Sequence, residues 1–147
     1  MTFYSRLFLS WAIVFGVIAT AMSAAQQKMC TQQEAAQAER ETNSLKTWNS
    51  VYKFYKKFSH CDDGGIAEGV SDAVAKLLAN RWDSVSELVK LVSSEKGFED
   101  FVLRHVDETI DWEQDVPKIR QNAKSRCPPN STRLCKALLE KTSPQRK

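Results

Sequence analysis

Apolar residues recur at spacings of three and four along most of the chain, which is the period of α-helices that bury one face. A first stripe comprises Leu45, Trp48, Val51, Tyr52, Tyr55 and Phe58. A second and clearer stripe comprises Ile66, Val70, Val74, Leu77, Leu78 and Trp82. The pattern therefore predicts one core helix that ends near Phe58 and another that runs from near Gly65 to near Trp82.

Four shorter helices are predicted farther along the chain. They occupy approximately residues 84–96, 98–106, 115–126 and 131–141. Ser84 and Glu87 have the spacing of a capping box at the start of the first of these helices. Pro117 suits the first turn of a helix that begins near Asp115, because the amide hydrogen that proline lacks would have no helical partner there.

The segment before the first stripe is polar and rich in alanine. We interpret residues 26–43 as a polar lead-in or as a solvated extension of the first core helix, although Asn43 and Ser44 could cap a new start. Residues 44–141 are expected to form an all-α domain, a compact bundle of five or six short helices stapled by two disulfides. Residues 142–147 are expected to form a disordered basic tail.

The first 25 residues have the pattern of a cleaved secretory signal peptide. Arg6 precedes an apolar run at residues 7–18, and Ser23, Ala24 and Ala25 are small residues of the kind that a signal peptidase accepts. The run is too short for a membrane-spanning helix, which needs about 20 apolar residues. The chain is therefore expected to reach the periplasm or the exterior, with no membrane contact after cleavage.

The charge balance is close to neutral. The whole chain carries 21 basic and 18 acidic side chains, and Arg6 is the only charged residue in the predicted signal. A balance of this kind predicts no nucleic acid or other polyanion as a partner.

Four cysteines follow the predicted cleavage site, so two disulfides are the default expectation. If the chain is helical without a break through residues 31–58, the ends of that helix lie about 40 Å apart. Bridged Cα atoms are only about 4.4–6.8 Å apart, so this geometry favours Cys61–Cys127 with Cys30–Cys135. A break near Asn43 would instead allow Cys30–Cys61 and a small Cys127–Cys135 loop.

The segment HCDDGGIAEG at residues 60–69 is the richest in candidate chemistry. Most of it suits a helix start, with a glycine turn and an aspartate cap. Four carboxylates could nevertheless converge there, as a cation site, a hydrolytic pair or an acidic docking patch. Docking is the functional interpretation that we favour. The candidate binding residues are His60, Asp62, Asp63, Glu68 and Asp72.

Other signals are weak. Neither histidine has a partner at metal-binding spacing, and no sequence motif of a nucleotide-binding or serine-hydrolase site is present. His105 lies on an apolar stripe, which is typical of a hydrogen-bonded core histidine. We therefore assign no catalytic residue and expect no metal ion or other cofactor.

Three segments together resemble a group of small exported bacterial proteins of uncharacterised function. They are CDDGGIAEG at 61–69, FVLRHV at 101–106 and CPPNSTRLC at 127–135. The resemblance spans most of the chain after the signal and implies a Gram-negative periplasm. It implies no activity, substrate or site.

Two functions remain as hypotheses. The first is an exported non-enzymatic binding protein, such as an inhibitor or immunity-type factor that docks a periplasmic protein partner through the acidic patch. The second is a small periplasmic hydrolase that uses Glu68 as the acid, with Asp63 or Asp72 as the second carboxylate. The oligomeric state and the identity of the partner stay open.

Overall fold

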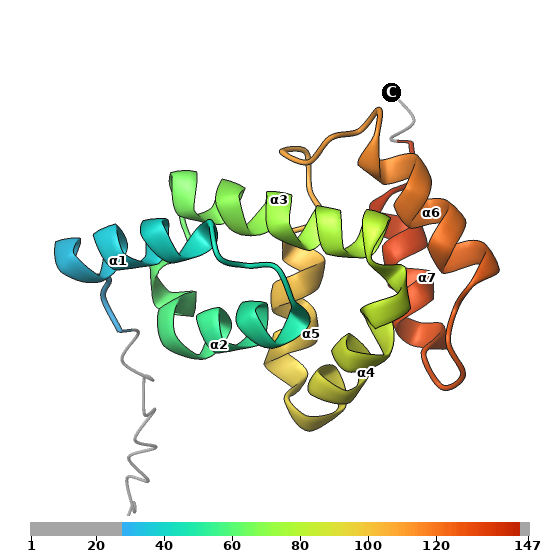
Figure 1. Cartoon of the computed structure of the whole chain (residues 1–147), viewed down its shortest axis with the longest axis horizontal. Helices are drawn as coiled ribbons and strands as arrows, with labels where there is room; N and C mark the ends of the chain where they lie inside the picture. Colours follow the sequence, from blue (N-terminus) through green and yellow to red (C-terminus); the bar gives the residue numbers. More distant parts are fainter. Residues whose placement is uncertain (1–27, 145–147) are drawn as a thin grey trace, which may run out of the picture.

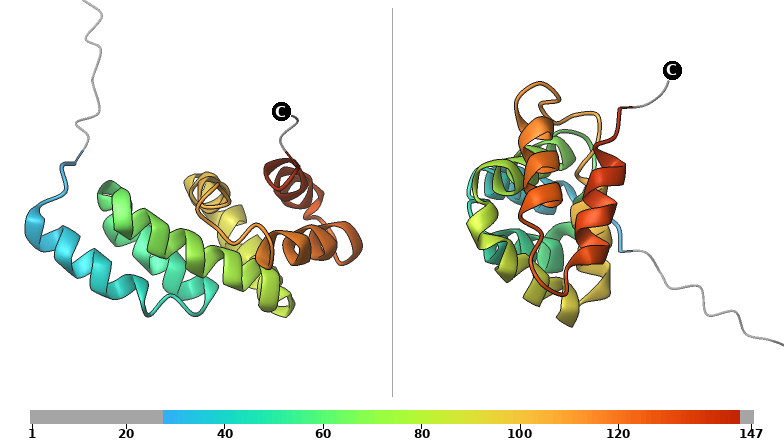
Figure 2. Two further views of the ribbon diagram at one scale, coloured as in Figure 1. Left: turned by 90° about the horizontal axis from the view of Figure 1, so that it is seen from above. Right: turned by 90° about the vertical axis from the view of Figure 1, so that its right-hand side faces the viewer.

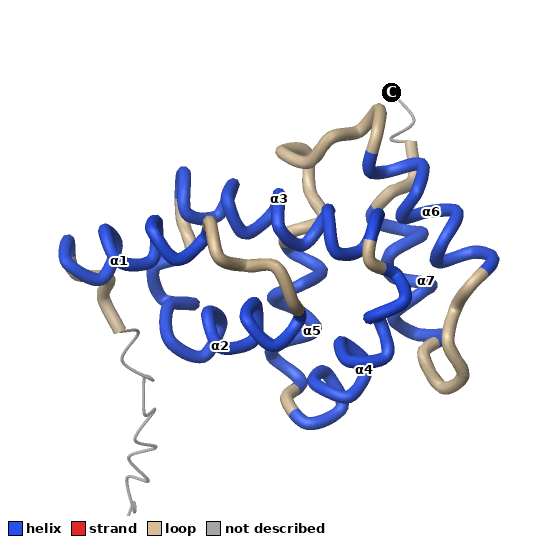
Figure 3. The backbone as a smooth tube through the Cα atoms, in the orientation of Figure 1, coloured by secondary structure: helices blue, strands red, loops and turns tan. Residues whose placement is uncertain are grey.

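The computed structural model describes residues 28–144, and all regular secondary structure in that range is helical (Figure 1, Figure 3). The helices are α1 (Gln32–Thr42), α2 (Trp48–Phe58), α3 (Gly64–Asn80), α4 (Val85–Ser94), α5 (Lys96–Arg104), α6 (Asp115–Ser125) and α7 (Thr132–Lys141). Single 3₁₀ turns, η1 (Ser59–Cys61) and η2 (Trp82–Ser84), follow α2 and α3. The predicted all-α fold with two disulfides is confirmed. The predicted signal peptide lies outside the described residues.

The longest helix, α3, lies at the centre of the bundle. Helices α1 and α2 lie along its first half, and α6 and α7 lie at the opposite end of the molecule from α1 (Figure 1, Figure 2). Most side chains of α3 are buried, and its exposed positions form a narrow stripe that includes Glu68, Asp72 and Lys76. A central helix with so narrow a solvent face must satisfy its buried polar groups from neighbouring helices.

Aromatic side chains fill the core between α2 and α5. Trp48, Phe54, Phe58, Phe98 and Phe101 are at most 1% exposed. Tilted and edge-on ring contacts connect the two helices, as expected for aromatic pairs. The first apolar stripe identified from the sequence did not include Phe54, which the structure buries.

The polar lead-in forms a separate core helix, α1, so the bundle has seven helices over residues 28–144 where five or six were expected. Thr31 and Glu34 form a complete capping box at its start, and Thr47 caps α2 after the break. Small residues let α1 approach α3 closely. A Cβ atom at Gly69 would lie 2.9 Å from the Thr42 side chain, and Ala38 is fully buried.

The favoured disulfide pairing, Cys61–Cys127 with Cys30–Cys135, is wrong. The structure pairs Cys30 with Cys61 (Cα–Cα 5.0 Å) and Cys127 with Cys135 (Cα–Cα 6.1 Å). The chain reverses direction between α1 and α2, so the end of α2 lies beside the start of α1 (Figure 1). The unbroken helix that would have separated Cys30 from Cys61 does not exist.

Helix α6 completes the end of α3. The Asn122 side-chain amide donates to the carbonyls of Leu78 and Ala79, at 3.0 and 3.1 Å. These are final-turn carbonyls, which have no partner within their own helix. The indole of Trp82 donates to the carbonyl of Arg126 at 2.8 Å. Side chains distant in the sequence therefore satisfy the end of the central helix.

The chain stays ordered slightly beyond the expected boundary of the tail. Thr142 is 1% exposed, and its hydroxyl donates to the Leu138 carbonyl at 2.6 Å. Residues 145–147 of the predicted disordered tail lie outside the described residues. Within residues 28–144, no helix has the length and apolarity needed to cross a bilayer.

Candidate functional site

The four predicted carboxylates do not form one patch. Asp63 is used as the cap of α3, and its Oδ1 accepts from the amide of Gly64 at 2.8 Å. Gly64 has a φ of +51°, a left-handed conformation that glycine adopts without steric cost. Asp62 turns into the protein, with a side chain that is 8% exposed. The Asp-Asp-Gly-Gly turn is therefore first of all a helix start.

The other two carboxylates lie farther along the exposed stripe of α3. Glu68 and Asp72 are both solvent-exposed. Asp72 forms an ion pair with Lys76 at 2.6 Å, one helical turn away. Asp72 faces a different hollow from the one lined by Asp62 and Asp63. The proposed pairing of Glu68 with either neighbour as a hydrolytic site therefore has no shared cleft that would hold a substrate.

Asp62 belongs to what we call the inner network, formed by Asp62, Ser71, Arg104, His105 and Asp107. The Asp62 carboxylate lies 3.2 Å from both Arg104 Nη2 and His105 Nε2. On the other side of the imidazole, Nδ1 lies 3.0 Å from the Ser71 hydroxyl, which also donates to Asp107 at 3.3 Å. The contact with His105 Nε2 is an ion pair only when the imidazole is protonated, and it lacks the alignment of a hydrogen bond.

Two opposing effects act on the Asp62 carboxyl. Burial favours its neutral form and would raise its pKa, but the contacts with His105 and then Arg104 outweigh this effect. The pKa of Asp62 is therefore held below its ordinary value. The carboxylate is charged at neutral pH and ties the turn before α3 to the end of α5.

The inner network has the residue types of a serine hydrolase, but substrate has no access to it. Ser71 is 1% exposed and His105 is 3% exposed. The ring of Phe101 packs edge-on against the imidazole, with centroids 4.6 Å apart. A nucleophile must reach its substrate, so this network serves structure. The prediction that His105 is a hydrogen-bonded core histidine is confirmed.

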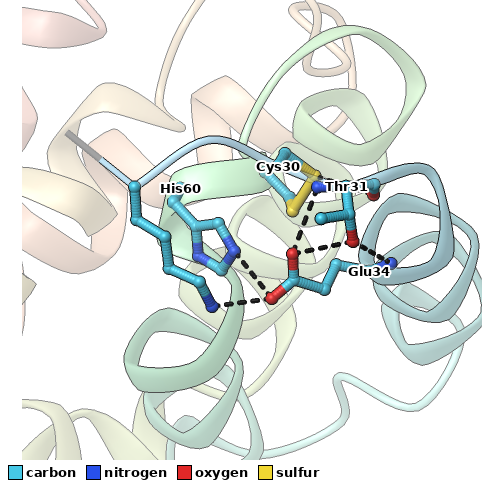
Figure 4. The surroundings of a disulfide bond; sticks show 6 residues. Cys30, Thr31, Glu34 and His60 are labelled. Atoms are coloured by element: carbon cyan, nitrogen blue, oxygen red, sulfur yellow. Dashed lines mark hydrogen bonds and ion pairs between the residues drawn. A yellow bond between two sulfur atoms is a disulfide. The ribbon is translucent and has the colours of Figure 1, made fainter.

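His60 lies in a second polar cluster, beside the Cys30–Cys61 disulfide (Figure 4). Its Nε2 faces Glu34 Oε1 at 3.3 Å, and Lys28 donates to the same oxygen at 2.6 Å. The ammonium of Lys28, followed by the backbone and hydroxyl of Thr31, lowers the pKa of Glu34 from 4.5 to about 2. This cluster joins the start of α1 to η1.

A hollow that we call the basic groove lies between the α1–α2 connection and α3. Its volume is about 350 Å³. Leu45, Ala73 and Leu77 form an apolar floor, while Lys46, Asp72, Lys76 and Arg81 supply the charges around it. Within residues 28–144, Lys46 and Arg81 make no ion pair, whereas Lys76 is paired with Asp72. The groove therefore presents two uncompensated cations above an apolar surface.

Sequence reasoning missed the basic groove and three of the five residues of the inner network. Lys46 and Arg81 come from segments that only the reversal between α1 and α2 brings together. One available signal was Ser71, a polar residue within the buried stripe of α3. A hydroxyl at such a position needs a buried partner.

Comparison of the chain with models of known protein families, with curated proteins and with solved structures found no match.

Proposed function

We propose that this chain is an exported, non-enzymatic binding protein of the periplasm, an inhibitor or immunity-type factor that docks a protein partner. The predicted signal peptide and the resemblance to small exported bacterial proteins support the compartment. Two disulfides also support it, because such bonds persist mainly in oxidising compartments. The observation that carries the docking function is the basic groove.

The chemistry of the groove selects the kind of partner. An apolar floor with polar groups at its rim is the usual composition of a binding site, and 350 Å³ provides room for a few side chains. Lys46 and Arg81 would attract carboxylates and orient them at the rim. The segment that fits is a protruding acidic stretch of a protein that also carries an apolar side chain.

This proposal reverses the charge of the partner expected from the acidic motif. Asp62 is buried and paired, and Asp63 caps α3, so neither is free to hold a basic partner. The remaining carboxylate at the groove, Asp72, is already paired with Lys76. An acidic partner therefore suits the basic groove better than a basic one.

The catalytic alternative lacks an accessible reaction centre among residues 28–144. Ser71 and His105 are enclosed, and the exposed Glu68 has no second carboxylate in a common cleft. A small scaffold with a fixed groove and an enclosed polar interior suits an inhibitor of a secreted enzyme. Binding of this kind depends on a preorganised surface, which two disulfides help to provide.

The test is affinity purification of the tagged mature protein from the periplasm of its own host, followed by mass spectrometry. The groove variant is Lys46→Glu/Arg81→Glu. Its matched control, Lys53→Glu/Lys90→Glu, changes two other exposed lysines that make no ion pair within the described residues. We expect a stoichiometric partner that the parent and control retain and the groove variant loses.

A third variant, Asp63→Asn/Glu68→Gln, tests the acidic version of docking. Loss of the partner only in this variant would show that the partner binds the acidic motif and not the basic groove. Absence of a partner from every sample would overturn the binding function itself. With a purified partner, calorimetry is expected to show affinity for the groove variant weakened by roughly tenfold or more, since 1.4 kcal/mol corresponds to a factor of ten.

A further inference from the structure

Four side chains with metal-ligating atoms meet where α1 begins and η1 ends. They are Cys30, Glu34, His60 and Cys61, drawn in Figure 4. The ligand atoms of Glu34, His60 and Cys61 all lie within 4.8 Å of one another. The Cys30 sulfur lies next to this group because it is bonded to that of Cys61. The two sulfurs of one disulfide, an imidazole and a carboxylate therefore lie close together in the fold.

Helix-end geometry positions the side chains in each half of this cluster. The capping box turns Glu34 back toward Thr31, which follows Cys30 directly. The η1 turn places His60 next to Cys61 at the end of α2. Both halves are held by helix-end geometry as well as by the disulfide.

One potential ligand, His60, lacks a partner, and an exposed lysine holds one oxygen of another, Glu34. The Nε2 atom of His60 is buried and has no aligned hydrogen-bond partner, although it faces Glu34. Lys28 holds the Glu34 oxygen, but the Lys28 side chain is 64% exposed and can move into solvent. A cation could replace the contacts of Lys28 and also give the imidazole nitrogen a partner.

We propose that, once the Cys30–Cys61 disulfide is reduced, these four side chains bind one zinc ion or a similar borderline-soft divalent cation. Zinc in proteins takes four ligands in a tetrahedron, chiefly cysteine sulfur and histidine nitrogen, with carboxylate oxygen also used. In the oxidised protein the sulfurs are bonded to each other and are not thiolate ligands. The site therefore exists only in the reduced state.

The chemistry balances with a dithiol as the reductant. The dithiol transfers two electrons and two protons to the disulfide and becomes a disulfide itself, which leaves two cysteine thiols in the chain. The metal ion then displaces both thiol protons to solvent. Cys30 is exposed, so an attacking thiolate can reach the bridge.

The consequence is that α1 and η1 are cross-linked in both states, by the disulfide in the oxidised protein and by the metal ion in the reduced protein. Either one joins the same two segments and keeps α1 against the bundle. In the reduced protein without metal, the start of α1 keeps its capping box and exposed ion pairs but has no covalent link to η1. This inference is independent of the docking proposal, because the cluster and the basic groove share no residue.

The experiment uses the full mature chain with Cys127→Ser/Cys135→Ser, so that a single cysteine pair remains. The protein is reduced with a phosphine, and Co²⁺ is titrated as a spectroscopic probe. We expect thiolate-to-cobalt charge-transfer bands and the intense visible bands of tetrahedral cobalt, saturating at one equivalent and abolished by Zn²⁺. The oxidised protein is expected to give neither set of bands.

Three further variants identify the ligands. Glu34→Gln and His60→Ala are each expected to weaken Co²⁺ binding by roughly tenfold or more and to alter the visible bands. Glu39→Gln changes another carboxylate of α1, one that is exposed and outside the cluster, and is expected to bind like the parent. Parent-like binding by both the Glu34 and His60 variants would overturn the four-ligand site, as would tetrahedral bands in the oxidised protein.

Circular dichroism keeps the test decisive if reduction unfolds the chain. In that case Zn²⁺ is expected to restore the helical signal of the reduced parent but not that of His60→Ala. A reduced protein that neither shows tetrahedral cobalt bands nor regains helicity with Zn²⁺ would disprove the site.

Discussion

Ser71 and Asp72 are neighbours in the sequence, yet they face opposite environments on α3. Ser71 points into the inner network, where it contacts His105 and Asp107 and is 1% exposed. Asp72 points to solvent at the basic groove and is paired only with Lys76. One side of the helix thus has hydrolase-like residues without access, and the other has access without a catalytic pair.

The contrast shows that the type of a side chain does not by itself determine its role, because burial decides whether it can reach a ligand. Enclosing Asp62 and His105 costs solvation, which is offset only when each charge is paired and the remaining polar atoms have partners. Such a network fixes the relative positions of the helices. Recognition by a partner depends on the groups that stay exposed, such as Lys46 and Arg81.

The largest expected effect comes from breaking the inner network. Asp62→Ala removes the carboxylate that faces the buried His105 Nε2 and also removes the link to Arg104. We expect the free energy of unfolding to fall by about 3 kcal/mol, the lower end of the range for a broken buried pair. Urea denaturation at neutral pH measures it, and a loss below about 1 kcal/mol would show that the pair contributes little.

A second effect appears on acidification. The lowered pKa of Asp62 stabilises the folded protein above the unfolded-state pKa of about 3.9, and this stability is lost as the pH falls through the folded-state value. His105, Arg104 and, through Ser71, Asp107 are the charged or titratable groups of the network around it.

The matched chain for this test is Asp62→Asn/His105→Gln, which lacks both partners of the buried pair. Between pH 5 and pH 3 the parent is expected to lose more of its free energy of unfolding than this variant. The pKa of Glu34, which is about 2, is common to both chains and cancels in the comparison. Equal losses in the two chains would rule out the proposed linkage.

A smaller effect is expected from Ser71→Ala. The change removes one buried hydroxyl and leaves His105 Nδ1 without its partner. We expect the free energy of unfolding to fall by about 1–2 kcal/mol, because an unsatisfied buried group costs more than a lost hydrogen bond contributes. Thermal unfolding followed by circular dichroism measures the change, and a stability equal to that of the parent would contradict it.

The smallest effect on stability is expected at the neighbouring position. Asp72→Ala removes an exposed ion pair, which contributes about 0.3–0.5 kcal/mol, and alanine's higher helix propensity offsets that loss. The expected change in the free energy of unfolding is close to zero in the same urea experiment. A loss comparable to that of Ser71→Ala would show that the two sides of α3 are not energetically different.

Much of the fold was predictable because apolar periodicity reports directly on helices with large buried side chains. The helices α2 to α7 follow from that signal. Helix α1 does not, because it packs through Ala38 and a close approach to Gly69, and small residues leave no apolar stripe. The wrong disulfide pairing has the same origin, since the reversal between α1 and α2 lies in that polar segment.

The candidate site was predictable only in its local part. The cap at Asp63 and the turn at Gly64 follow from neighbours in the sequence. The partners of Asp62, in contrast, lie about forty residues away on another helix, and no spacing rule links them. The rim of the groove also depends on tertiary packing, so sequence reasoning could not determine its charge.

The disulfide pattern has a consequence for biosynthesis. The structure joins the first cysteine to the second and the third to the fourth. An oxidase that joins thiols in the order in which they emerge would form both native bridges directly, with no wrong pair to reshuffle. Oxidative maturation of this chain would then require no disulfide isomerase.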